Sequence, residues 1–138
     1  MRSVTTRPVD LLAVTAGSIR LASGLSFLIT PDAANRLWGD AEDSGPTASL
    51  LLRSMGYRDA LIGGMLLRSG LRGDASAAGW FLASAGADGA DLLGGISNHH
   101  RMTDQQRLRG LGGAAVGIAI GLLGAARARA RGGWRPSA

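Results

Sequence analysis

Six charged residues lie inside stretches of this chain that are otherwise apolar and rich in Gly and Ala. Three are cations and three are anions: Arg20, Arg53, Arg58, Asp59, Asp88 and Asp91. A charge at the centre of a bilayer costs about 2.5–3.5 kcal/mol on insertion scales, so such residues usually face the interior of a helix bundle and mark a functional site. We therefore expect these six side chains to turn toward one another.

Four segments are long and apolar enough to form helices that cross a bilayer, which takes about 20 residues each. The first must end before Pro31, because proline disfavours a helical residue before it, and Asp74 is a candidate N-cap for the third. The predicted helices cover residues 9–30, 47–67, 75–97 and 108–126, and a basic tail follows at 127–138. The chain is therefore predicted to be all-α, with residues 1–138 forming one membrane domain, an antiparallel bundle of four transmembrane helices.

A soluble four-helix bundle is the competing fold. Soluble helices carry one apolar stripe and one polar face. The fourth segment has no charged residue between Leu111 and Ala126, and the charges of the second segment spread over most of its circumference. Both patterns favour the membrane fold.

The net charge of +5 would also suit a nucleic-acid-binding protein. No nucleic-acid-binding motif accompanies it, however, and four arginines follow the last apolar segment, where the positive-inside rule places cytoplasmic residues. These are Arg127, Arg129, Arg131 and Arg135. We therefore expect the lipid bilayer of the inner (plasma) membrane as a partner, both termini in the cytoplasm, and no nucleic acid.

The second segment places Arg58 and Asp59 on either side of its most apolar strip, so each can turn to a different neighbouring helix. We expect the strip to face lipid; it consists of Leu51, Met55, Ile62 and Leu66. A face of small residues, which favours close helix packing, is formed by Ser49, Gly56, Ala60 and Gly63.

The third segment carries Trp80, Ser84, Asp88 and Asp91 on one face, because residues three or four apart are neighbours on a helix. Two carboxylates at this spacing repel each other, so either a cation lies between them or one of them holds a proton. Such a carboxyl group could act as a general acid or base. Equally, the two could simply neutralise Arg58 and either Arg20 or Arg53.

These patterns define a candidate site with no cofactor and no metal. The candidate catalytic residues are Asp59, Asp88 and Asp91, and the candidate substrate-binding residues are Arg20, Arg53, Tyr57, Arg58, Trp80 and Ser84.

The fourth segment carries a strip of glycines that predicts tight helix packing. The strip consists of Gly110, Gly113, Gly117, Gly121 and Gly124. It could pack inside the chain or form a homo-oligomer, and the sequence leaves both open.

The run Gly56-Tyr57-Arg58-Asp59, followed by Gly63 and an apolar stretch, resembles the Gly-x-Arg-acidic signature in the second helix of a small bacterial membrane family. Members of this family are four-helix proteins, mostly of unknown function, that often carry an acidic residue late in the third helix. Asp88 or Asp91 would match that residue. The resemblance covers roughly residues 8–126 and implies the fold more than an activity.

The predicted function is that of a small integral membrane protein with an intramembrane Arg/Asp pocket. It would perform acid–base chemistry, such as isomerisation or cyclisation, on an apolar small molecule. Non-catalytic binding, proton-coupled transport and a purely structural accessory role are the alternatives. Small four-helix multidrug exporters rely on an acidic residue in the first helix, and none lies between Leu11 and Thr30, which disfavours transport.

Overall fold

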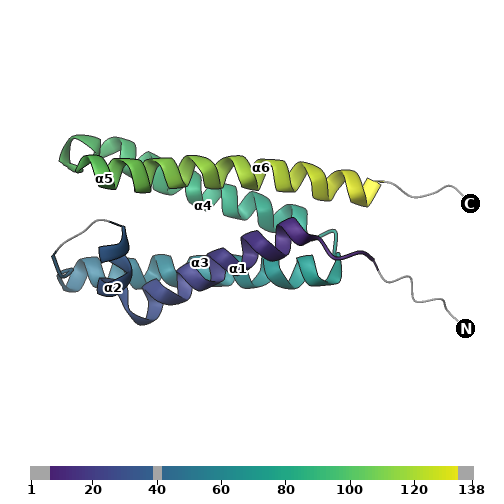
Figure 1. The fold of residues 1–138 in the computed structure, drawn as a ribbon, viewed down its shortest axis with the longest axis horizontal. Helices are drawn as coiled ribbons and strands as arrows, with labels where there is room; N and C mark the ends of the chain where they lie inside the picture. Colours follow the sequence, from purple (N-terminus) through teal and green to yellow (C-terminus); the bar gives the residue numbers. More distant parts are fainter. Residues whose placement is uncertain (1–6, 39–41, 134–138) are drawn as a thin grey trace, which may run out of the picture.

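The computed structural model describes residues 7–38 and 42–133, and this part of the chain is all-helical (Figure 1). The long helices are α1 (Leu11–Ile29), α3 (Pro46–Arg72), α4 (Ala77–Ser97) and α6 (Gly112–Gly133). Shorter turns join them: α2 (Pro31–Leu37), a 3-10 turn (His99–Arg101), α5 (Asp104–Gln106) and a π-helical turn (Arg107–Leu111). Two helical stretches are long and apolar enough to cross a membrane, Leu11–Ile29 and the run Asp104–Gly132. The helices α3 and α4, which carry five of the six charges, do not meet the same criterion.

Capping explains where the helices begin and end. Asp10 caps α1, since its Oδ1 accepts hydrogen bonds from the backbone N–H groups of Leu12 at 3.1 Å and Ala13 at 3.3 Å. Helix α3 ends at Arg72, five residues beyond the predicted end at residue 67. Its C-cap is Gly73, whose φ of 58° is a left-handed conformation that suits glycine. The prediction of Asp74 as the N-cap of α4 is wrong, because that N-cap is Ser76. Asp74 instead accepts a bond from the Ser76 N–H in the turn.

A single residue, Thr30, separates the short helix α2 from α1. Thr30 is the N-cap and Pro31 the first helical residue. Asp32 accepts hydrogen bonds from both the hydroxyl and the N–H of Ser44, and these two bonds hold the pKa of Asp32 below its ordinary value. This contact ties α2 to the segment that leads into α3.

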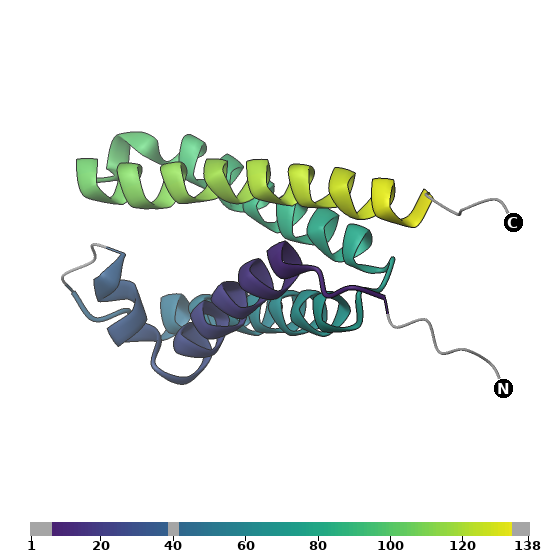
Figure 2. The same ribbon diagram turned by 45° about the vertical axis from the view of Figure 1, so that its right-hand side comes forward.

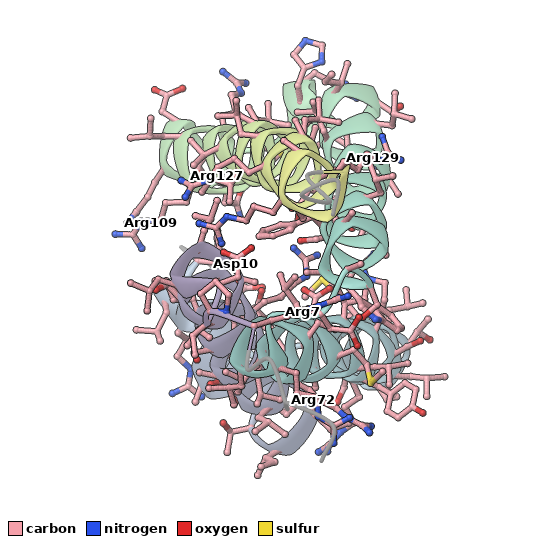
Figure 3. The ribbon with its side chains drawn as sticks, turned by 90° about the vertical axis from the view of Figure 1, so that its right-hand side faces the viewer. Arg7, Asp10, Arg72, Arg109, Arg127 and Arg129 are labelled. Carbon is pink, nitrogen blue, oxygen red and sulfur yellow. The ribbon has the colours of Figure 1, made fainter. Side chains whose placement is uncertain are left out.

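The last helical run is longer than predicted at both ends. A capping box starts it, in which Thr103 Oγ1 accepts from the Gln106 N–H and Gln106 Oε1 accepts from the Thr103 N–H. It continues to Gly133, so residues 127–133 of the predicted basic tail are helical, while Arg135 lies outside the described residues. Figure 3 looks onto the end where α1 begins and α6 ends, and several arginines lie around this end: Arg7, Arg72, Arg127 and Arg129.

The four long helices pack as two close pairs, α1 with α3 and α4 with α6. The two helices of each pair run antiparallel. In the α1/α3 pair the backbones touch, since a Cβ added to Gly63 would lie 2.8 Å from the Gly17 carbonyl oxygen. In the α4/α6 pair a Cβ added to Gly121 would lie 2.7 Å from the Ala85 Cβ. The small-residue face predicted for the second helix therefore packs on α1. Gly117, Gly121 and Gly124 face α4 of the same chain, so this part of the glycine strip is not free for a second copy.

The two pairs converge at the α3–α4 turn and separate toward α2 and α5 (Figures 1 and 2). At the converged end Asp10 links three helices: its N–H donates to the Gly70 carbonyl at 2.9 Å, and its Oδ2 lies 3.5 Å from Arg131 NH1. The apolar core lies here and consists of Ala13, Leu66, Ala77, Ala78, Phe81, Ala125 and Ala128.

The prediction that one apolar strip of α3 faces lipid is wrong for three of its four members. Leu66 is 1% exposed and Ile62 is also buried, because the four long helices meet at this level. Met55 faces the space between the pairs, and only Leu51 lies on the outside.

Candidate functional site

A cavity of about 660 Å³ is lined by residues of both helix pairs and extends toward α2. All four long helices line it, and α2 and the π-helical turn contribute residues at its α2 end. Much of its wall is apolar, with Ile19, Phe27, Trp38, Met55 and Met102 among the lining residues. This volume and character are typical of pockets for small molecules.

Arg20 of α1 crosses from one helix pair to the other inside this cavity. Its NH1 donates to both carboxylate oxygens of Asp88, at 2.9 and 3.0 Å, and to Ser84 Oγ at 2.9 Å. Its NH2 donates to Asp59 Oδ1 at 3.0 Å. The side chains of Arg20, Asp59 and Asp88 are 13%, 15% and 13% exposed. This buried cluster joins α1, α3 and α4 through ionic hydrogen bonds.

Arg58 of α3 extends the same network toward α4. Its NH1 and NH2 donate to the two oxygens of Asp91 at 3.1 and 2.8 Å, the forked geometry that arginine forms with a carboxylate. Its Nε donates to Asp59 Oδ1 at 3.0 Å. The five side chains thus alternate in charge along a chain: Asp88, Arg20, Asp59, Arg58 and Asp91.

The network contains two guanidinium groups and three carboxylates, so it has one carboxylate in excess. Arg20 with Asp88 and Arg58 with Asp91 form two pairs between helices, and Asp59 bridges them. Only Oδ1 of Asp59 is used, because its Oδ2 accepts no hydrogen bond from the described residues. Asp59 also lines the cavity, so it is the carboxylate that can meet a bound molecule.

A sequence profile described as a domain of unknown function (DUF4267) matches residues 17–126. The chain belongs to this family. The match spans the whole charge network and every described cavity-lining residue except Ala16, whereas no curated protein and no solved structure matches the chain. The Gly-x-Arg-Asp signature in residues 56–59 remains a prediction for the DUF4267 family.

In this DUF4267 chain the structure brings together six of the nine predicted site residues. They are Arg20, Arg58, Asp59, Ser84, Asp88 and Asp91. Arg58 and Asp59 turn to different helices, as their positions on either side of the apolar strip predict. Asp88 and Asp91 do not share one cation, because each has its own arginine.

The other three predicted site residues lie away from the cavity. Arg53 donates to the Leu28 carbonyl at 2.6 Å and so caps the end of α1. Tyr57 is 62% exposed on the outside of α3. Trp80 packs against the apolar core at the converged end. None of them lines the cavity, because α3 and α4 turn these faces away from it.

Sequence reasoning missed the residues at the α2 end of the cavity. Asn35 and Trp38 of the α2 segment meet Met102 and Gly110 here, and the same four residues border a second hollow of about 320 Å³. Gly110 belongs to the π-helical turn, a distortion that is frequent at functional sites. Hydrophobic periodicity does not reveal a π turn, although the closely spaced glycines at 110, 112 and 113 offered a weak signal.

Proposed function

We propose that the chain is a small membrane protein whose four long helices cross the bilayer as an antiparallel bundle. Support comes from the distribution of polarity, which is inverted relative to a soluble protein: the Arg20/Asp59/Asp88 cluster is largely buried between the helices, and large apolar side chains point outward. Each long helix exposes such residues, for example Leu25, Leu61, Leu93 and Leu122. Soluble monomers rarely expose extensive contiguous apolar surface, whereas lipid-facing helices require it.

The arginines at the α1/α6 end support a topology with both termini in the cytoplasm, since cytoplasmic flanks are enriched in Arg. Reporter fusions at residue 138 and within residues 39–45 should then report opposite sides of the membrane. A reporter that is active on the same side at both positions would contradict the four-span topology.

The function we propose is binding of an apolar small molecule in the cavity between the helix pairs, with acid–base chemistry at its charged wall. The main support for this proposal is that the Arg20/Asp59/Asp88 cluster lines a cavity whose wall is otherwise largely apolar. Purely structural ion pairs need no cavity beside them, and a buried charge network is expensive to maintain.

Within this proposal Asp59 is the acid–base group and the two arginines hold it in place. Its Oδ1 is fixed by Arg20 and Arg58, which leaves Oδ2 to take a proton from a bound molecule or to return it. Asp88 and Asp91 keep the arginines in position through their own ion pairs. Isomerisation or cyclisation of an apolar molecule requires this kind of proton transfer.

Binding in the cavity is testable by tryptophan fluorescence with bromododecanol, whose bromine quenches nearby indole rings. In lipid nanodiscs we expect saturable quenching that Trp38→Phe removes and Trp80→Phe preserves, because Trp38 lines the cavity and Trp80 does not. Gly94 lines the cavity, and a Cβ added to it would meet no atom within 4 Å. Gly94→Leu should therefore fill the cavity and abolish the saturable component of the quenching.

The matched control is Gly86→Leu on the same helix, which also meets open space but lies outside the cavity lining. It should retain quenching at the parent level. Equal quenching in Gly94→Leu and Gly86→Leu would mean that the probe reports on the surrounding lipid, and binding in the cavity would be refuted.

A further inference from the structure

We infer that the cavity selects an apolar molecule carrying a single positive charge, such as a lipophilic amine in its ammonium form, with Asp59 as its counter-ion. This inference rests on the proposed function, because it names the class of molecule that the same cavity takes. It follows from the charges that line the cavity and from the bonds they already make.

The ion pairs between helices leave one negative charge uncompensated. Arg20 is matched by Asp88 and Arg58 by Asp91, and each pair is neutral. Asp59 is the third carboxylate, held between the two guanidinium groups. Charges interact strongly where water is largely excluded, so a cationic occupant that balances this site is favoured over a neutral or anionic one.

Among the described residues, those that line the cavity from elements other than α1 include no cation. Among the lining residues, α2 and its end contribute Asn35 and Trp38, and α6 contributes small and apolar residues such as Gly117 and Ile120. Arg20 is the cavity's lining cation, and its NH1 and NH2 are already bonded to the carboxylates. Its Nε is buried and has no hydrogen-bond partner among the described residues, so the two carboxylates are the groups that Arg20 already satisfies on the cavity side.

Asp59 has an acceptor oxygen, Oδ2, that can receive a hydrogen bond from an ammonium group in the cavity. Asp59 Oδ2 accepts no bond from the described residues, while Asp59 lines the cavity beside Ala16, Ser23 and Met55. An ammonium group donates hydrogen bonds and accepts none, so it complements a carboxylate oxygen. The apolar remainder of the molecule would lie along the wall toward Phe27 and Trp38.

The test compares three probes with the same chain and different head groups, namely dodecylamine, dodecanol and dodecanoate. The affinity of each probe is measured by its competition with bromododecanol for the full-length protein in nanodiscs of neutral lipid. The pH is 7, where an alkylamine is protonated. We expect dodecylamine to bind at least about tenfold more tightly than dodecanol, a difference of about 1.4 kcal/mol. Dodecanoate should bind most weakly.

Asp59→Asn removes the charge but keeps an oxygen that can accept from Arg20 and Arg58. In this variant dodecylamine should lose its advantage and bind like dodecanol, while dodecanol binds as it does to the parent. Asp104→Asn is the matched control, because Asp104 is fully exposed and is not among the residues that line the cavity. It should leave all three affinities unchanged.

The outcomes separate the inference from the proposed function. If dodecanol and dodecylamine displace the probe equally, or dodecanoate binds most tightly, the cation preference is wrong while binding in the cavity stands. If no probe displaces bromododecanol, both fail. Should Asp59→Asn fail to fold, the head-group series on the unmodified protein decides the inference.

Discussion

Arg20→Ala is expected to destabilise the folded chain by about 3–5 kcal/mol, the loss that follows when one partner of a buried ion pair is removed. The substitution leaves Asp59 and Asp88 facing each other without the cation that both contact, at sites that are largely buried. Among the described residues the Arg20–Asp88 pair is the only ion pair between α1 and α4, and it is lost together with the bond from Arg20 to Ser84. Unfolding in detergent, followed by circular dichroism, measures the effect.

A second substitution and a control make this result interpretable. Adding Asp88→Asn to Arg20→Ala should recover part of the stability, since it removes the carboxylate that loses its ion-pair partner, whereas Asp59 keeps its bond to Arg58. Arg53→Ala should stay within about 1 kcal/mol of the parent, because Arg53 donates to a carbonyl at an exposed site. An Arg20→Ala variant that melts like Arg53→Ala would show that the network does not stabilise the fold.

Gly63→Leu should be the most damaging change in the packing between helices. Even its first side-chain carbon would lie 2.8 Å from the Gly17 carbonyl oxygen and 2.9 Å from the Arg20 carbonyl carbon, so α1 must move away from α3. Overpacking usually costs about 1–3 kcal/mol, and here we expect at least about 3 kcal/mol because backbone cannot give way as a side chain does. The shift of Arg20 should also separate it from Asp59.

The control for Gly63→Leu is again Gly86→Leu, where the added side chain meets no atom within 4 Å. It should be as stable as the parent or slightly more so, since glycine inside a helix is unfavourable. The two variants are compared by unfolding in the same detergent. Equal stability would contradict the close backbone packing of α1 on α3.

The helices and the inward turn of most charges could be predicted from the sequence, because they depend on local patterns. Pro31 ends the first helix, and Arg58 and Asp59 diverge because adjacent residues on a helix point about 100° apart. The small residues at 17, 24, 56 and 63 indicate tight packing, and they form the α1/α3 contact.

The pairing of helices could not be predicted, and it decides the rest of the site. A helical wheel finds the apolar strip of α3 but does not tell which part of it meets lipid and which part meets other helices, so Ile62 and Leu66 were misplaced. The same ambiguity put Arg53 and Trp80 in the candidate site, whereas Arg53 donates to a carbonyl at the end of α1 and Trp80 packs against the core. The α2 end of the cavity forms only when the pairs separate, which no local pattern encodes.

The central claim is that this chain turns its apolar side chains outward to lipid and its charges inward to the cavity. The sequence has no cysteine, so single cysteines can carry spin labels without further changes. In proteoliposomes, labels at Leu61→Cys and Leu122→Cys should collide freely with oxygen, which concentrates in lipid, and be shielded from a water-soluble nickel complex. A label at Asp104→Cys, an exposed position, should show the reverse. Nickel access at Leu61 and Leu122 equal to that at Asp104 would place these faces in water and contradict the membrane fold and the cavity function built on it.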